Sequence, residues 1–178
     1  MNKKFGFILM IFLGTLLFAC EADKELSIIS KEASIDKYIE TKFKDSTIVK
    51  NKGVYRVLID KSTIKDSLEY GDSLAFFYAG FIFNNGPSQI FATNNMAAAE
   101  QLNFNLTNLD FSVKKVKFSE DVFVTGLERG MFGVREGEHS IIVFSPRYGF
   151  ENEIVYNIPR LSSLMYVVWI QEIKKKNI

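Results

Sequence analysis

The stretch FVTGLERGMFGVREGEHSIIVFSPRYGF, residues 123–150, decides the fold. Thr125 and Glu128 have the spacing of a capping box, which predicts the start of a short helix. The β-branched and aromatic run at 141–144 then predicts a strand. Pro146 ends that strand, because its nitrogen carries no hydrogen for a ladder bond. The stretch therefore predicts a helix, a turn, a strand and a loop, in that order.

The loop after this strand carries two aromatic residues, Tyr148 and Phe150. Beside a short apolar helix, they indicate an apolar groove rather than a charged catalytic centre. The chain as a whole is rich in aromatics, with 17 Phe and 7 Tyr among 178 residues. This composition favours a β-rich core or an aromatic-lined pocket.

Charge and reactive residues exclude several classes of function. The formal net charge of +1 gives no reason to expect a nucleic-acid partner. The single Cys and the single His, His139, exclude a disulfide framework, a Cys-cluster metal site and a multi-His metal site. We therefore expect no metal and no cofactor. Because His139 follows Gly137-Glu138 at the start of a strand, we expect its imidazole to be exposed.

The first twenty residues predict a targeting segment. Lys3 and Lys4 precede an apolar run of signal-peptide length, which is too short to span a bilayer comfortably. The run ends in Leu17-Phe18-Ala19-Cys20, which resembles the lipobox of bacterial lipoproteins. This resemblance implies a signal peptide over 1–19 and a lipid on Cys20 that anchors the protein to a membrane of the bacterial cell envelope, with the outer membrane expected. The alternative is an ordinary secretory signal that ends near a cysteine.

Residues 20–52 are expected to contain a tether and an amphipathic helix. The tether is the polar segment 21–30, and apolar residues then recur at helical spacing over 35–43. Ser30 or Ser34 is the expected cap of this helix. The helix either packs on the surface of the domain or binds a partner or second copy, so the oligomeric state stays open.

Residues 53–178 predict a single β-rich domain. Asn85-Gly86 is a strong hairpin-turn signal, a short helix is expected within 94–101, and 174–176 is expected to be a solvated end. Because helices are too few for parallel crossovers, we expect an α+β fold: a twisted antiparallel sheet of five to six strands wrapped around one short helix. Strands are predicted at Val54–Asp60, Ser73–Phe83, Gln89–Ala92, Ile141–Phe144 and Leu164–Ile173, with shorter ones at Leu102–Leu106 and Val113–Phe118.

Four segments, in order along the chain, resemble the FKBP-type peptidyl-prolyl isomerases. They are Phe76–Gly80, Phe91 after the Asn85-Gly86 turn, Phe123–Met131, and the closing region with Ser145–Phe150, Ile158-Pro159 and Leu164–Tyr166. The resemblance implies an FKBP-like fold, of the bacterial lipoprotein subgroup. It also implies catalysis of rotation about X–Pro bonds without any cofactor, with proline-containing polypeptides as partners.

The same resemblance implies a groove that holds the proline ring. It assigns catalysis to Tyr78, Phe91, Val124, Tyr148 and Tyr166, and substrate binding to Phe123, Leu127, Phe150 and Ile158. The backbone N–H of Val124 would hold a substrate carbonyl, and the loop aromatic, either Tyr148 or Phe150, would pack over it. Three positions depart from the family pattern: Ala92 replaces the usual Asp, Leu127 the pocket-floor Trp, and Arg160 the second Pro of an Ile-Pro-Pro loop.

Three functions follow as hypotheses. The first is a membrane-anchored prolyl isomerase that assists folding of exported proteins. The second is a catalytically weak FKBP-like chaperone or binding lipoprotein, which Ala92 favours. The third is a structural envelope lipoprotein with a vestigial pocket.

Overall fold

The structure, a computed structural model, describes residues 3–107 and 110–176, with side chains described from residue 21 onward. Its strands are β1 (Thr47–Asn51), β2 (Val54–Asp60), β3 (Ser73–Phe83), β4 (Pro87–Thr93), β5 (Lys114–Lys117), β6 (His139–Phe144) and β7 (Ser163–Lys174). They form one seven-stranded sheet in the order β1-β2-β6-β7-β3-β4, and β5 also pairs with β3. All of these pairings are antiparallel.

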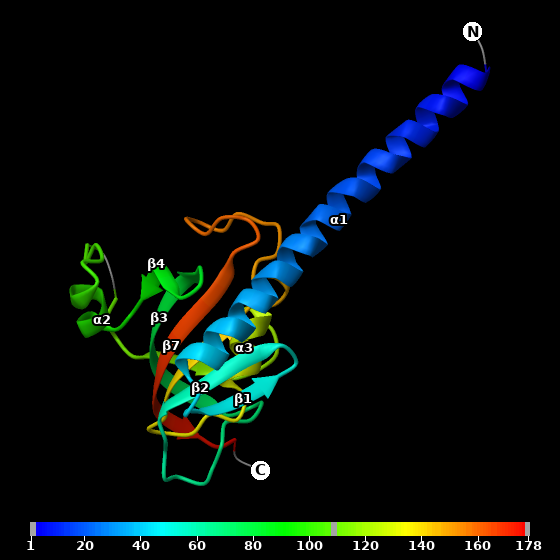
Figure 1. Ribbon diagram of the computed structural model, residues 1–178. Coiled ribbons are helices and arrows are strands. Elements are labelled where there is room, and N and C mark those ends of the chain that lie inside the picture. Colours follow the sequence, from blue (N-terminus) through cyan, green and yellow to red (C-terminus); the bar gives the residue numbers. More distant parts are fainter. Residues whose placement is uncertain (1–2, 108–109, 177–178) are drawn as a thin grey trace.

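Helices pack on both faces of this sheet. They are α1 (Lys3–Lys42), α2 (Met96–Gln101), α3 (Thr125–Met131) and the single 3-10 turn η1 (Pro146–Tyr148). The long helix α1 crosses one face, and the short helix α3 packs on the other (Figure 1). In the part of the chain with described side chains, no helix is long and apolar enough to cross a membrane.

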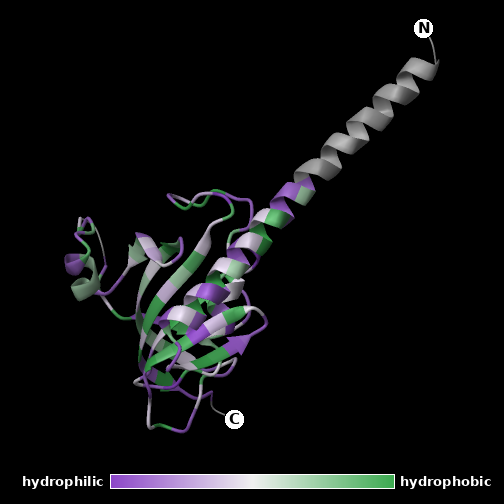
Figure 2. Cartoon of the chain, viewed as in Figure 1, coloured by the Kyte–Doolittle hydropathy of each residue, from purple (hydrophilic) through white to green (hydrophobic). Residues whose placement is uncertain are grey.

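The face that carries α3 holds the larger core. Leu127 and Met131 from α3 pack on alternate residues of β7, including Tyr166 and Val168. The intervening residues of β7 point to the other face, because side chains alternate along a strand. Both faces of β7 are therefore covered, which explains why its sequence is almost continuously apolar. Figure 2 shows hydrophobic colouring along much of the central strands.

The opposite face is covered by α1. Ile35 and Ile39, each 2% exposed, pack on Val57, Val143 and Met165 of three neighbouring strands. Polar contacts also tie α1 to the segment after β6. Glu32 accepts a hydrogen bond of 2.9 Å from the Ser145 hydroxyl and forms an ion pair of 3.3 Å with Arg147. The C-terminal part of α1 is thus packed against the sheet.

Most predicted elements are confirmed, and the α+β class and antiparallel sheet are among them. The predicted bounds of β2 and β3 match those of the structure. The turn at Asn85-Gly86 is also present, with positive φ at both residues. The expected strand count of five to six is wrong, because β1 supplies a seventh strand that we did not predict.

Several local predictions are wrong. The segment 102–106 is irregular rather than a strand. The segment 21–30, expected to be a polar tether, is helical, and Ile28 within it is buried because it faces the domain. Neither Ser30 nor Ser34 begins a helix, since α1 starts at Lys3. The division into three domains stays a prediction, and the lipobox lies among the residues whose side chains are not described.

The C-terminal lysines, Lys174–Lys176, are exposed as predicted, and two of them are also hydrogen-bonded to the domain. Lys175 Nζ donates to Asp72 Oδ2 at 2.7 Å, and the Lys176 backbone N–H donates to Asp72 Oδ1 at 2.9 Å. Asp72 is fully buried and also accepts from the Glu69 backbone N–H. A buried carboxylate needs such partners, because its desolvation is costly when it is unpaired.

Candidate functional site

A cavity of about 840 Å³ opens between the sheet, the start of α3 and the loop that follows β6. Its walls are largely aromatic and aliphatic, with one cation and one anion. The lining residues are Phe76, Tyr78, Ala92, Lys114, Asp121, Val122, Phe123, Val124, Leu127, Phe150, Tyr156 and Tyr166. Such a mostly apolar hollow with a few polar groups is typical of a ligand site.

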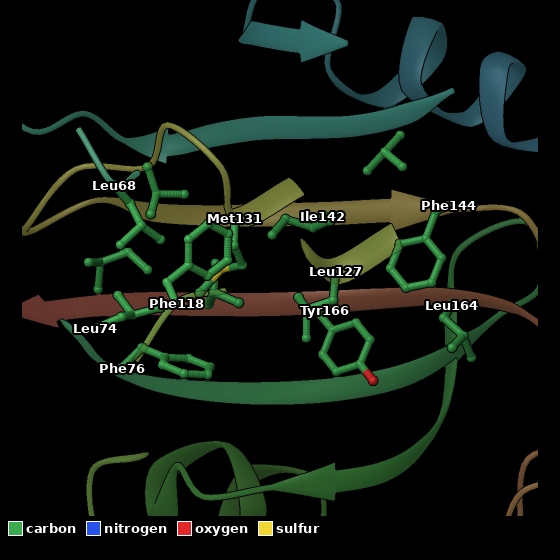
Figure 3. Close-up of a cluster of buried hydrophobic side chains, with 14 of the residues drawn as sticks. Leu68, Leu74, Phe76, Phe118, Leu127, Met131, Ile142, Phe144, Leu164 and Tyr166 are labelled. Carbon is green, nitrogen blue, oxygen red and sulfur yellow. The ribbon is translucent and has the colours of Figure 1, made fainter. Parts of the chain in front are cut away.

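Tyr166 and Leu127 form the floor of this cavity, where β7 meets α3. The Tyr166 ring stacks at 6.0 Å on Phe144 and meets Phe91 edge-on at 5.6 Å. It is therefore held on two sides by other rings. Figure 3 shows the ring beside Leu127, with the hydroxyl oxygen directed away from the buried side chains. The floor is rigid and apolar, with one hydroxyl group near its edge.

Tyr78 forms a side wall, with its ring 6.4 Å from that of Tyr166. The end of β4 fixes its backbone. Asn94 Oδ1 accepts a hydrogen bond of 2.7 Å from the Tyr78 N–H, and the Thr93 hydroxyl donates to the Tyr78 carbonyl at 2.7 Å. Burial raises the pKa of both tyrosines, so both hydroxyls stay neutral at physiological pH.

The opposite wall is the start of α3, with Phe123 and Val124. Val124 is the N-cap residue, and its side chain makes no capping hydrogen bond. The predicted capping box is therefore wrong. Thr125 is the first helical residue, and Glu128 instead accepts hydrogen bonds from the Tyr70 hydroxyl at 2.6 Å and the Asp121 N–H at 3.0 Å. Because the first N–H groups of a helix have no partner within the helix, they are available at this wall.

The far end of α3 is fixed by Arg56, a buried residue of β2. Its guanidinium donates to the carbonyls of Gly130 at 3.0 Å and Phe132 at 2.9 Å, and lies 3.3 Å from Glu138. A cation at a helix C-terminus is favoured by the helix dipole. Burial lowers the pKa of Arg56, and the Glu138 charge opposes that effect. The arginine thus holds the helix that forms the cavity wall.

The two loop aromatics line different hollows of the structure. Phe150 lines the cavity, whereas Tyr148 lies outside it. A methyl group at Gly53 would lie 2.7 Å from the Tyr148 ring, and the Arg129 guanidinium lies 4.7 Å from its centre. Placing Tyr148 over the groove is therefore wrong, because its ring turns toward β2 and α1. Because phenylalanine has no hydroxyl group, Phe150 adds no hydrogen-bond donor to the cavity.

The other predicted site residues divide into two groups. Tyr78, Phe123, Val124, Leu127, Phe150 and Tyr166 line the cavity together. Phe91 and Ile158 do not, because Phe91 packs behind Tyr166 and Ile158 is 3% exposed within the core. They support the lining rather than form it. Cys20 lies outside the residues with described side chains.

Sequence reasoning did not place six lining residues in the site. Phe76 and Ala92 both lie at positions that the resemblance covered but did not assign to the site, and strand alternation from Tyr78 was a usable signal for Phe76. Asp121 and Val122 lie just before α3. Lys114 lies on the strand predicted at Val113–Phe118, whose pairing with β3 no local pattern gives, and Tyr156 lies in an irregular loop. The remaining lining residues therefore become visible only when the fold is assembled.

The polar chemistry of the site is sparse. Among the described residues, no group of three His, Cys, Asp or Glu side chains is placed to hold a metal ion. His139 lies away from the cavity, stacked at 5.0 Å on Trp169 and 3.1 Å from Asp60. It is half-buried there, so the expectation of an exposed imidazole is wrong. The cavity suits a process that depends on shape and polarity rather than on proton transfer.

The fold is similar to that of FKBP-type proteins of known structure. FkpA from Escherichia coli superposes with a TM-score of 0.61 at 15% identity, covering 99% of this chain and 75% of that one. The three FKBP domains of wheat FKBP73 give a TM-score of 0.56 at 15% identity, covering 74% of this chain and 50% of that one. No family model and no curated protein matches the sequence. The likeness therefore shows an FKBP-like fold.

Proposed function

We propose that this protein is a peptidyl-prolyl cis-trans isomerase that rotates X–Pro bonds inside the cavity. The observation that carries this proposal is the joint placement of Tyr78, Phe123, Val124, Leu127, Phe150 and Tyr166 around one hollow of about 840 Å³. These residues come from β3, α3 and the two residues before it, β7, and the loop after β6. The FKBP-like fold supports the same conclusion.

The mechanism follows from the physics of the peptide bond. Amide resonance opposes rotation with a barrier of about 20 kcal/mol. For X–Pro bonds the two isomers are close in energy but exchange slowly. The twisted transition state has lost resonance and is less polar than the planar amide. A mostly apolar cavity binds it better than the ground state, and this difference in binding lowers the barrier.

The side chains have distinct roles in this mechanism. Tyr166 and Leu127 form the floor on which the proline ring rests. The backbone N–H of Val124, at the start of α3, donates to a substrate carbonyl and fixes one side of the rotating bond. Phe150 and Tyr78 exclude water from the other sides. No residue acts as acid, base or nucleophile, so the rate should change little between pH 6 and 8.

The test is a prolyl-isomerisation assay on the full chain in neutral detergent. We expect acceleration of a Leu-Pro peptide, a loss of about tenfold or more in kcat/KM for Tyr166→Ala, and a larger loss for Val124→Asp. Tyr38→Phe, on α1 at the opposite face, is the matched control and should retain the parent rate. Circular dichroism confirms that each variant is folded. Rates equal to those in buffer would reject the enzymatic proposal.

The cellular setting is the second part of the proposal. A lipid on Cys20 would hold the domain at the bacterial cell envelope, expected at the outer membrane, where proline-containing exported chains fold. A diacylated cysteine gives stable anchoring, whereas one chain is marginal. Fractionation should find the parent in membranes and Cys20→Ala outside them, with Ser27→Ala as control. If the parent, Cys20→Ala and Ser27→Ala were distributed equally between membrane and soluble fractions, the proposed lipid anchor on Cys20 would be contradicted.

One observation favours an alternative, a catalytically weak binding protein or chaperone of the same fold. Ala92 lines the cavity at a position where the resemblance implies a carboxylate. A chaperone of this kind would bind Pro-containing segments and suppress aggregation without accelerating isomerisation. Peptide binding lost on Phe150→Ala, together with buffer rates in the isomerase assay, would select this alternative.

A further inference from the structure

Strand β5 distributes its lysines over two faces of the sheet. Lys114 pairs directly with Phe76 on β3. Residues directly opposite in an antiparallel pair share a face, and both of these line the cavity. Lys115 and Lys117 instead line a separate groove with Glu172. One lysine of this basic strand therefore reaches the cavity, and its neighbour provides a matched comparison on the other face.

Lys114 has no ionic partner among the described residues. The ion pairs found there, with N···O distances up to 4.0 Å, include neither Lys114 nor Asp121, the other charged residue of the lining. Asp121 belongs to the opposite wall, where its backbone N–H is hydrogen-bonded to Glu128. The cavity thus has a basic side at β5 and an acidic side at α3.

The lining residue that β4 supplies is uncharged. Ala92, on β4, lines the cavity from the same edge of β3 that pairs with β5. Ala92 pairs with Gly80, four residues along β3 from Phe76, and its methyl group carries no charge. The charge of Lys114 therefore stays available to a ligand on this side of the cavity.

We propose that Lys114 is a specificity-determining residue that selects substrates with an acidic residue next to the proline. This rests on the proposed isomerase function and names its substrate class. The proline ring occupies the apolar floor at Tyr166, and a flanking Asp or Glu side chain meets the Lys114 ammonium. Because Lys114 is exposed, the water-like estimate applies, and an ion pair at about 6 Å then favours the charged ligand about threefold. Added salt weakens it.

The experiment compares matched peptides that differ by one charge. The full chain in neutral detergent is assayed with peptides that carry Glu or its neutral isostere Gln directly before or directly after the proline. The readout is the ratio of kcat/KM for Glu over Gln, at low and at high ionic strength. The variants are Lys114→Met, Lys114→Glu and the control Lys115→Met.

We expect a ratio of about three or more at one of the two flanks at low salt, falling toward one at high salt. Lys114→Met should bring the ratio to one, Lys114→Glu should invert it, and Lys115→Met should leave it at the parent value. A parent ratio of one at both flanks would overturn the proposal. So would a Lys115→Met effect equal to that of Lys114→Met, since the preference would then come from overall surface charge.

The same experiment distinguishes failure of the isomerase function from failure of the charge preference. In that case none of the peptides is accelerated by any variant, and the ratio of Kd values for the same Glu and Gln peptides replaces the ratio of kcat/KM. A Kd ratio that follows Lys114 supports the charge preference in a binding protein. Equal Kd values in the parent overturn it.

Discussion

Gly126 of α3 lies directly against the ring of Phe144 on β6, so closely that a methyl group at this position would fall 2.2 Å from Phe144 Cγ. One turn later, Gly130 has the same relationship to Ile142, also at 2.2 Å. Positions four apart share one face of a helix. Two glycines therefore let α3 approach the sheet, and this approach places Leu127 and Val124 at the cavity.

Gly126→Ala should destabilise the protein by about 1–3 kcal/mol, because the added methyl group overpacks the contact with Phe144. Chemical denaturation measures the loss. Phe144→Leu removes the ring and should make Gly126→Ala less costly in the double variant. Strictly additive losses would mean that the two residues do not meet as described.

Arg56→Met should cost about 3–5 kcal/mol of unfolding free energy. It removes the hydrogen bonds to the carbonyls at the end of α3 and leaves Glu138 as a buried charge without its partner. Adding Glu138→Gln should recover part of the loss. Arg135→Met, at an exposed arginine, should change stability by less than about 0.5 kcal/mol. Similar losses at both arginines would contradict the buried role of Arg56.

Asp72 should make stability depend on acid pH. Burial alone would raise its pKa, but hydrogen bonds from Lys175, Lys176 and Glu69 outweigh this and hold the pKa below its usual 3.8. A carboxyl group with a lowered folded-state pKa stabilises the fold above its unfolded pKa, and this stabilisation is lost as the pH falls through the folded value. Asp72→Asn should therefore be less stable than the parent at pH 7.

The measurement is the urea midpoint of parent and Asp72→Asn between pH 7 and pH 2. The difference between them should stay constant down to about pH 4 and shrink below it. Asp66→Asn is a suitable control, because Asp66 is exposed. A difference that grows as the pH falls would show that the pKa of Asp72 is raised instead.

Phe150 and Tyr148 should respond differently to substitution, although they are two residues apart. Phe150→Ala opens a wall of the cavity and should lower kcat/KM by about tenfold or more, with most of the effect in KM. Tyr148→Phe changes a ring outside the cavity and should leave the rate within about twofold. The isomerase assay measures both variants. A larger loss of kcat/KM for Tyr148→Phe than for Phe150→Ala would show that Tyr148 is the loop aromatic of the site.

Long segments with a consistent pattern were predictable from sequence. Strands β2 and β3 and the turn at Asn85-Gly86 depend on the local pattern of apolar residues and on residues typical of turns. Both can be read from the sequence alone. The strand β1 was missed because it is only five residues long and mostly exposed, so it has no buried face to give an alternating pattern. Its signals were the β-branched Thr47, Ile48 and Val49 before the turn at Gly53.

The errors at the site have a different cause. Tyr148 and Phe150 both fit the loop position by sequence, and the choice between them depends on η1, which turns Tyr148 toward Gly53 and leaves Phe150 at the cavity. The capping role of Thr125 failed because Glu128 is engaged by Tyr70, which is 58 positions away in sequence. Both outcomes depend on tertiary contacts that no local pattern contains.

Because α1 buries an apolar cluster on one side of the sheet, expressing the β-rich part alone would fail. A fragment that begins at Gly53 would lack both Ile35 and Ile39 and the strand β1, and so would expose Val57, Val143 and Met165 to water. Such a fragment would precipitate or self-associate for reasons unrelated to its ligand site. Recombinant work on this protein should therefore keep the helix and cut upstream of Ile28.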